Sequence, residues 1–328
     1  MLANIKNTIA KFNMVSSGDR RIIVALSGGA DSVCLLYALR EIIYDHVGSG
    51  FHARPFTIEA CHVNHKLRGE ASDADEQFVR ELCERLDVKL HVREIDVKAL
   101  QKKHQSLEEC AREARYSYLS EIGTDALIAT AHTANDNTET VILNLTRGTG
   151  LRGLCGIPPV RGNIIRPLIE TTRAEILSYL SERGAEYVTD ESNYSDEFTR
   201  NNLRLNIIPL LEKINPSLNA GITRMCEVLR LDEEYLHEIA VVECRGAYYA
   251  SDNAYNVDLL IKQPPAILNR IISLILSKNN ISPSNLRISN IVSLLKPGGK
   301  INLCKNKFAI VSDNLLYIKT IPQNYRKN

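Results

Sequence analysis

Short apolar runs alternate with helix-like stretches through the first 200 residues, and this alternation limits the fold more than any other feature of the chain. The expected strands are 21–27, 57–64, 89–95, 126–130 and 164–168, and the helices between them include 31–45, 72–86 and 106–122. Strands that alternate with helices are typical of a parallel sheet with helices on both faces. The sequence therefore predicts an α/β fold with a doubly wound parallel sheet.

Two local signals refine this prediction. Ser106 and Glu109 have the spacing of a capping box, which indicates that a helix begins there. Near the N-terminus, Leu2, Ile5 and Ile9 fall at helical spacing without a continuous apolar core. This pattern favours a short leading helix over a secretory signal, with a basic transit peptide as the weaker alternative.

The chain divides into three expected parts. A catalytic domain covers residues 1–205, and a mostly helical connector, interrupted at Pro216, covers 206–249. A small basic α+β domain covers 250–328, with a helix at 265–276 and short strands after Pro297-Gly298-Gly299.

A glycine-containing loop joins the first expected strand to the helix that follows. Its residues are Ser27, Gly28, Gly29, Ala30, Asp31 and Ser32. Two glycines let the backbone turn tightly and bring N–H groups close to an anion, and the helix N-terminus adds partial positive charge. The loop is neither a Walker A motif nor a dinucleotide fingerprint. A plain turn is the alternative for Gly-Gly alone, but the whole hexapeptide predicts a phosphate-binding loop.

This hexapeptide resembles the SGGxDS signature of the PP-loop ATPases, also called N-type ATP pyrophosphatases. The resemblance implies that ATP is cleaved between its α- and β-phosphates and that AMP passes to a substrate oxygen. The hydroxyl groups of Ser27 and Ser32 are then candidates to donate hydrogen bonds to the phosphate oxygens. Asp31 is a candidate ligand for the Mg²⁺ that accompanies a triphosphate.

Further stretches resemble one family of that superfamily, the tRNA(Ile)-lysidine synthases, over about residues 20–215. They are HVNHKLR (62–68), AREARY (111–116), AHTANDNTET (131–140), LTRGTGLRGL (145–154), RPLI (166–169), DESN (190–193) and TRNNLR (199–204). Asn135-Asp136-Asn137 stands where Asp-Asp-Gln is common in this family, so the second acid is kept and the first is lost.

The resemblance implies ligation of free L-lysine to C2 of the wobble cytidine in an isoleucine tRNA with a CAU anticodon. ATP, with Mg²⁺, would first adenylate the cytidine, and lysidine, AMP and pyrophosphate would be the products. The C-terminal part resembles the substrate domain of the family more weakly. The chain has no room for the second C-terminal domain of longer members, so it resembles the short form.

Each candidate catalytic residue has a simpler alternative. Asp136 is a candidate for Mg²⁺ or for taking the proton of the attacking amine, and a first-turn helix acid is the alternative. His132 is a second candidate base, although a lone histidine is more often a hydrogen-bonded structural residue. Arg112 and Arg115 lie three residues apart on one helix, so one can face the α-phosphate or the activated base. Solvated helix charges are the alternative for this pair.

The resemblance places His62 and His65 at the border of the adenosine pocket, whereas isolated histidines would be read as turn residues. The remaining candidates are expected to hold RNA phosphates, with surface salt bridges as the alternative for the arginines. They are Arg147, Arg200, Arg204, Lys300, Lys305 and Lys307.

The charge is strongly uneven along the chain. Residues 261–328 contain eleven Lys and Arg against one acid, Asp313, a net charge of +10, whereas the other 260 residues hold 29 basic and 38 acidic residues. Phosphate neutralisation is the main source of nucleic-acid affinity, so this excess predicts contact with a polyanion. A solvated surface with few acids is the alternative.

Three alternative functions can be compared with the proposed one from the sequence. A PP-loop tRNA thiolase would need reactive cysteines, but the eight cysteines are scattered and form no CxxC pair. An amidase would need an ammonia-producing domain, and a nucleotide-gated RNA-binding protein without chemistry is the alternative outside enzymes.

No apolar run approaches the roughly 18 residues of a membrane span. We expect a cytoplasmic protein with reduced thiols, and a homodimer stays open.

Overall fold

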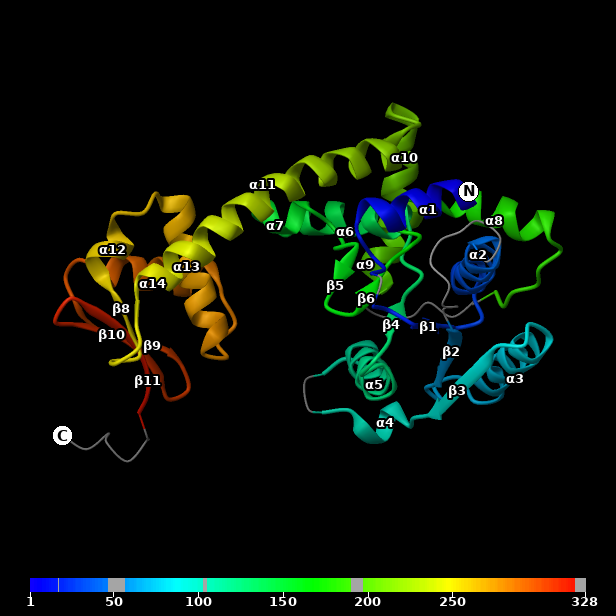
Figure 1. Ribbon diagram of the computed structural model, residues 1–328, viewed down its shortest axis with the longest axis horizontal. Coiled ribbons are helices and arrows are strands. Elements are labelled where there is room, and N and C mark those ends of the chain that lie inside the picture. Colours follow the sequence, from blue (N-terminus) through cyan, green and yellow to red (C-terminus); the bar gives the residue numbers. More distant parts are fainter. Residues whose placement is uncertain (17, 47–56, 103–104, 190–196, 322–328) are drawn as a thin grey trace. The chain divides into compact units, whose positions relative to one another are not determined.

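The computed structural model describes residues 1–16, 18–46, 57–102, 105–189 and 197–321 (Figure 1). They belong to two compact units, Met1–Glu227 and Val228–Asn328. The boundary falls within the long helix α11 (Leu218–Gly246), inside the segment expected to be a helical connector. Of the helices in the described part of the chain, none combines the length and apolar character that a membrane span requires.

The first unit is built on a six-stranded sheet with the order β3-β2-β1-β4-β6-β5. Its strands are β1 (Arg21–Ala25), β2 (Thr57–Asn64), β3 (Lys89–Glu94), β4 (Leu127–Ala129), β5 (Val160–Arg161) and β6 (Ile164–Ile165). Neighbouring strands are parallel except for β5, which pairs antiparallel with β6. The predicted doubly wound α/β fold is confirmed, with one short antiparallel edge strand that the sequence pattern did not indicate.

The helical elements of this unit connect and cover the strands. They are α1 (Leu2–Lys11), α2 (Ala30–His46), α3 (Glu70–Arg85), α4 (Val97–Leu100), α5 (Leu107–Ile122), α6 (Ala134–Thr146), α7 (Leu151–Leu154), α8 (Arg173–Glu182), α9 (Glu197–Asn202), the π-helix η1 (Leu203–Ile207) and α10 (Ile208–Ile214). The predicted leading helix is α1. The predicted capping box of α5 is half present, because Ser106 accepts a hydrogen bond from the Glu109 backbone N–H.

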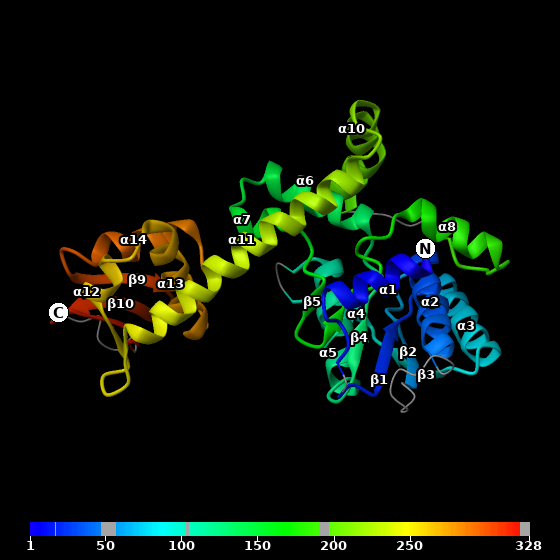
Figure 2. The same cartoon turned by 45° about the horizontal axis from the view of Figure 1, so that its top comes forward.

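Helices lie on both faces of this sheet (Figures 1 and 2). Successive side chains of a strand point to opposite faces, so β1 sends Ile22 and Val24 into the core formed with α2, α3 and α8. Ile23 enters the separate core formed with α5. The strand order reverses between β1 and β4, and such a reversal opens a crevice at the carboxyl ends of the two strands.

The second unit contains a five-stranded antiparallel sheet with the order β7-β8-β11-β10-β9. Its elements after α11 are β7 (Tyr248–Tyr249), β8 (Ala254–Asn256), α12 (Val257–Ile261), α13 (Pro265–Lys278), α14 (Asn285–Leu294), β9 (Gly299–Cys304), β10 (Lys307–Ser312) and β11 (Leu315–Thr320). Ile271 and Ile275 of α13 pack with Ala309 and Leu316 of the sheet. The predicted helix and strand-like pieces of the basic segment are therefore present.

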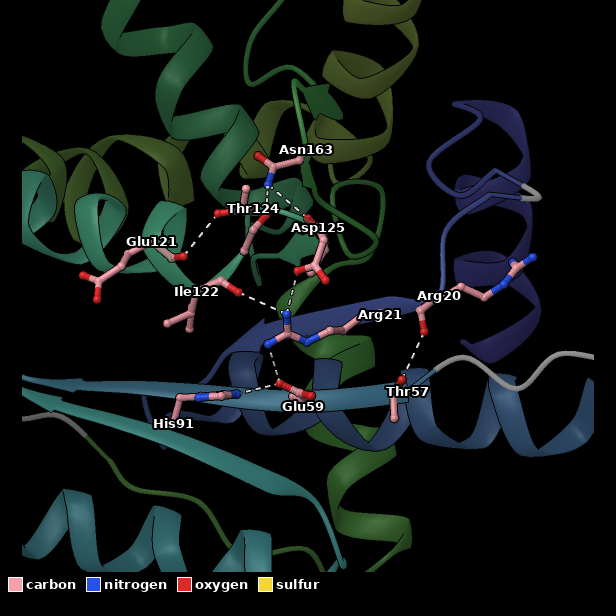
Figure 3. A network of polar contacts seen from close by, with 12 residues as sticks. Arg20, Arg21, Thr57, Glu59, His91, Glu121, Ile122, Thr124, Asp125 and Asn163 are labelled. Atoms are coloured by element: carbon pink, nitrogen blue, oxygen red, sulfur yellow. Dashed lines mark hydrogen bonds and ion pairs between the residues drawn. The ribbon is translucent and has the colours of Figure 1, made fainter.

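A polar network lies near the amino ends of the strands in the first unit (Figure 3). The carboxylate of Glu59 on β2 accepts a hydrogen bond from Arg21 Nη2 at 2.8 Å and lies 2.6 Å from His91 Nε2. Arg21 Nη1 also reaches Asp125 Oδ1 at 2.8 Å. Glu59 is only 6% exposed, and burial by itself would raise its pKa, but the contacts with Arg21 and His91 lower it to about 2. This network links β1, β2 and β3 near their amino ends, at the side of the sheet opposite the crevice.

We expect Glu59→Gln to lower the free energy of unfolding by about 1–3 kcal/mol near pH 7, because a buried charged hydrogen bond is lost. The folded pKa of Glu59 lies below its ordinary value, so its contribution is present above about pH 4.5 and is lost as the pH falls toward 2. Urea unfolding at pH 7 and pH 3 checks both points. An equal loss of stability at both pH values would contradict this assignment.

Candidate active site

The loop between β1 and α2 is held by its own hydroxyl groups. Ser32 Oγ donates a hydrogen bond to Gly29 O at 2.9 Å, accepts one from Ser27 N at 3.2 Å, and lies 3.1 Å from Ser27 Oγ. Gly28 has φ +91°, a conformation that side chains with a Cβ rarely adopt. The loop is therefore already bent at the carboxyl end of β1, where α2 begins.

A segment from after α8 lies against this loop. Val188 N donates a hydrogen bond to Gly28 O at 2.9 Å, and Val188 forms an isolated parallel bridge with Gly29. A Cβ on Gly28 would lie 3.4 Å from side-chain atoms of both Val188 and Val79. Glycine at this position thus serves the backbone turn and leaves room for close packing below the loop.

Asp31, in the first turn of α2, forms an ion pair with Arg173 at the start of α8. Arg173 is positioned by its backbone, since its N–H donates to Asn135 Oδ1 at 2.9 Å. The asparagine that replaces an acid of the family pattern thus joins the beginning of α6 to the beginning of α8.

Asp136 caps the start of helix α6, which was the alternative interpretation of this residue. One of its oxygens also faces the crevice. Its Oδ2 accepts hydrogen bonds from Thr133 N and Oγ1, both at 2.8 Å, in a complete capping box at the start of α6. Its Oδ1 lies 3.7 Å from Arg204 Nη2. One oxygen therefore fixes the helix end while the other belongs to the crevice.

Glu139 is a site residue that the sequence reasoning missed. It lies one helical turn after Asp136 and is only 3% exposed. Both of its oxygens meet Arg204, at 2.6 Å from Nε and 3.1 Å from Nη2. Arg204 lies on the π-helix η1, and such helices are frequent at functional sites. The spacing of three residues from Asp136 on one helix was the signal that could have identified Glu139.

The acids of the crevice interact with one another. Burial raises the pKa of Asp31, Arg173 lowers it, and the charge of Asp136 raises it further. Burial likewise raises the pKa of Glu139 against the opposing effect of Arg204. The loops after β1 and β4 therefore bring Asp31 and Asp136 close together, as expected from the shared edge of their strands.

The donor set fits Mg²⁺. This ion prefers oxygen ligands and is commonly bound by one or two carboxylates together with substrate phosphates. Asp31 and Asp136 would supply the carboxylates, next to a loop suited to phosphates. Within the described residues, no group of three or more His, Cys, Asp or Glu side chains is arranged to hold a metal. A full protein cage for a metal is thus not assembled there.

His132, which follows β4, lies near three arginines and the carboxylate of Asp136. Its Nδ1 lies 3.0 Å from Thr130 Oγ1. Burial lowers the pKa of His132 to about 4, and Arg166, Arg112 and Arg200 act in the same direction. The imidazole is therefore neutral near pH 7 and only weakly basic.

His62, on β2, and His65, directly after this strand, differ in setting. His62 is 5% exposed, and its Nδ1 lies 2.9 Å from Leu26 O, directly before the phosphate loop. His65 lies 3.3 Å from Arg115 Nη2, and burial followed by Arg115 lowers its pKa to about 4. We interpret His62 as a support of the loop, whereas His65 and Arg115 form a separate pair at the end of β2.

Among the residues predicted to hold RNA phosphates, Arg200 acts electrostatically on His132 and Glu139, whereas Arg147 and the three lysines do not join this cluster. Arg147 is exposed at the opposite end of α6 from Asp136. Lys300, Lys305 and Lys307 belong to the second unit, where Lys307 Nζ donates to Asn279 O at 2.5 Å. The DESN stretch (190–193) lies outside the described residues, as does the side chain at position 199.

Several known proteins are similar to this chain in sequence. The model of the PP-loop domain family matches residues 1–211. The chain is 40% identical, over 80% of its length, to the tRNA(Ile)-lysidine synthase of Parabacteroides distasonis, and covers 58% of that protein. It is 36% identical to the tRNA(Ile)-lysidine synthase of Clostridium acetobutylicum over 93% of its length, and covers 67% of that protein. The chain spans 55% and 48% of two other such relatives, from Bacteroides thetaiotaomicron and Porphyromonas gingivalis.

Among solved structures, a U34-tRNA thiolase from Methanococcus maripaludis is similar with a TM-score of 0.54 and 20% identity, over 70% of this chain and 78% of the thiolase. This likeness supports the fold alone. The matches in sequence, by contrast, extend over the phosphate loop and both acidic turns of the crevice. The chain belongs to the tRNA(Ile)-lysidine synthase family, within the PP-loop superfamily.

Proposed function

We propose that the protein joins free L-lysine to C2 of the wobble cytidine in an isoleucine tRNA with a CAU anticodon, using ATP. In the first step the cytidine O2 attacks the α-phosphorus of ATP, and pyrophosphate leaves. In the second step the lysine ε-amine attacks C2, and AMP leaves with the former O2. The observation that carries this proposal is the meeting of Asp31 and Asp136 beside the phosphate loop.

The residues of the crevice suit these two steps. The loop from Ser27 to Ser32 would offer backbone N–H groups and the exposed Ser27 hydroxyl to the triphosphate, whereas the buried Ser32 hydroxyl holds the loop. Mg²⁺ held by Asp31 and Asp136 would neutralise charge that develops on the phosphates. Ser27 is exposed, whereas Gly28 and Ser32 are buried, so the loop presents one side to a ligand.

The attacking amine must lose a proton, because free ammonium has no lone pair for C2. His132, with a pKa of about 4, is a weak base, and a carboxylate of the crevice is the other candidate acceptor for this proton. Burial raises the pKa of Glu139, which is one helical turn from Asp136. We therefore assign the proton transfer to the Asp136–Glu139 pair, which also has the charge to attract a cationic amine.

The thiolase alternative is disfavoured by the state of the cysteines. All eight cysteines are thiols that form no disulfide, and six of them are buried. Burial raises the pKa of Cys34 and Cys61 to about 12 and of Cys83 to about 11. Reactive cysteines have lowered pKa values in electropositive, partly exposed sites. These three thiols have the opposite character.

The reaction itself gives the direct test. We expect AMP and pyrophosphate to appear only when ATP, lysine and the isoleucine tRNA are all present, and lysidine to appear in digested tRNA by mass spectrometry. A methionine tRNA serves as the control with the same anticodon. ATP cleavage that ignores lysine and tRNA, or binding of RNA without any turnover, would contradict the proposal.

Asp31→Ala should lower turnover by about 100-fold or more, because Mg²⁺ and the reacting phosphates lose a charged partner. The affinity for tRNA should stay nearly unchanged, since Asp31 is assigned to the triphosphate. Product formation and filter binding measure the two effects. Asp125→Ala, which removes an exposed carboxylate at the opposite edge of the sheet, is the matched control. A large loss of tRNA affinity in Asp31→Ala would refute this division of roles.

The basic second unit is proposed to hold tRNA phosphates. Lys300 and Lys305 are exposed, whereas Lys307 is half-buried and bonded to Asn279, so the first two are the better probes. We expect the Lys300→Gln, Lys305→Gln double variant to bind tRNA more weakly and with a smaller salt dependence. Each lost phosphate contact should lower the slope of log Kd against log salt by about 0.7–0.9.

Lys98→Gln, an exposed lysine on α4 of the first unit, controls for the loss of positive charge alone. Fluorescence anisotropy at several salt concentrations gives both the affinity and the slope. If the double variant kept the wild-type slope, the basic segment would have another role.

A further inference from the structure

Three arginines gather around the short strand β6. Arg166 directly follows β6, Arg161 lies on β5 beside Ile164 of β6, and Arg112 projects from α5. Arg161 and Arg112 are close enough to Arg166 to disfavour its charged form. No ion pair links these three arginines to a carboxylate among the side chains that the structure describes. The cluster therefore carries positive charge without an internal counterion there.

Arg166 is unusual because it is only 4% exposed. Its Nη1 donates a hydrogen bond to Pro158 O at 2.6 Å, and its guanidinium also interacts with the Tyr116 hydroxyl. Its Nε is buried and has no hydrogen-bond partner in the described structure. A buried donor left unsatisfied costs about 1–3 kcal/mol, and more when it is charged. Such a group indicates either a missing ligand or stored strain.

The neighbours of Arg166 favour an anionic ligand. Arg112 lies over the ring of Tyr116, with its guanidinium carbon 5.4 Å from the ring centroid. Stacking of this kind limits the freedom of the side chain and leaves its N–H groups free to bind. His132 adds no positive charge near pH 7, so it can stand beside the arginines without repelling them. The planar guanidinium fork matches two oxygens of a phosphate group.

We propose that Arg112, Arg161 and Arg166 form a second phosphate site, which binds a phosphodiester of the RNA strand next to the target cytidine. This inference rests on the proposed function, because it takes the substrate to be RNA. The triphosphate of ATP is assigned to the loop after β1. β6 lies two strands away from β1 in the sheet, about 10 Å at the usual strand spacing. The two phosphate sites would thus flank the cytidine from opposite sides.

The test uses Arg161→Gln, because Arg161 is exposed and its replacement leaves the buried guanidinium in place. The probe is an RNA hairpin with a CAU loop, in its natural form and with uncharged methylphosphonate linkages on both sides of the target cytidine. We expect Arg161→Gln to weaken binding of the natural hairpin by about tenfold and to lower the salt slope by about 0.7. For the methylphosphonate hairpin, Arg161→Gln should change the affinity little, because the uncharged linkage has already removed the phosphate charge that Arg161 contacts.

Arg166→Gln and Arg166→Lys form the second pair of variants, with circular dichroism to confirm folding. Lysine keeps the positive charge but lacks the planar guanidinium group. The RNA affinity of Arg166→Lys should therefore lie between those of the wild type and Arg166→Gln. Arg85→Gln, an exposed arginine in the last turn of α3, is the matched control and should bind like the wild type. Binding of ATP, measured without RNA, should be the same in all these variants.

Two results would overturn the proposal. One is loss of ATP affinity with unchanged RNA binding, which would assign the arginines to a phosphate of ATP. The other is an equal loss for natural and methylphosphonate hairpins, which would mean that Arg161 contacts no phosphate there. Because these assays need no turnover, the site is tested separately from the reaction. A protein that bound the hairpin as described but released no AMP would refute the proposed function and leave this site standing.

Discussion

The crevice between β1 and β4 holds carboxylates close together, and their mutual repulsion is the constraint that organises the rest of the site. Asp31 and Asp136 act on each other electrostatically, and Glu139 is buried one turn further along α6. Burying such groups is unfavourable unless positive charge is nearby. Arg173 pairs with Asp31, and Arg204 pairs with Glu139 and faces Asp136. The positions of α8 and η1 are thus coupled to the chemistry of the crevice.

This arrangement separates stability from chemistry across the sheet. Near the amino ends of the strands, Glu59 is satisfied by Arg21 and His91, and its lowered pKa keeps it charged (Figure 3). At the carboxyl ends, by contrast, the pKa values of Asp31 and Glu139 are raised. Raised pKa values cluster where groups have been gathered for function rather than for folding. The pKa of a buried acid is therefore lowered at the amino ends of the strands and raised at their carboxyl ends.

Much of the site could be read from local patterns, because its residues lie just after apolar strands. The hexapeptide of the phosphate loop and Asp136 were both found in this way. The cap role of Asp136 does not exclude the proposed site role, because one oxygen caps α6 while the other faces Arg204. Glu139 was missed because its spacing of three residues from Asp136 was not used, although this spacing places both acids on one side of the helix. Arg204 was identified as an RNA contact, but the structure places it against the acids of the crevice.

The sequence by itself determined the order of strands and helices, the phosphate loop and the basic character of the second unit, since each depends on residues close together in the chain. Only the tertiary structure decided which charges meet. Asp31 and Arg173 are far apart along the chain, as are Glu139 and Arg204, and no periodicity relates them. Arg112 and Arg166 are likewise distant in the chain, whereas Arg161 and Arg166 are brought together by the β5–β6 hairpin. Asp31 and Asp136 meet because the parallel strands β1 and β4 end at one edge of the sheet, and the packing of α8 and η1 brings Arg173 and Arg204 to them.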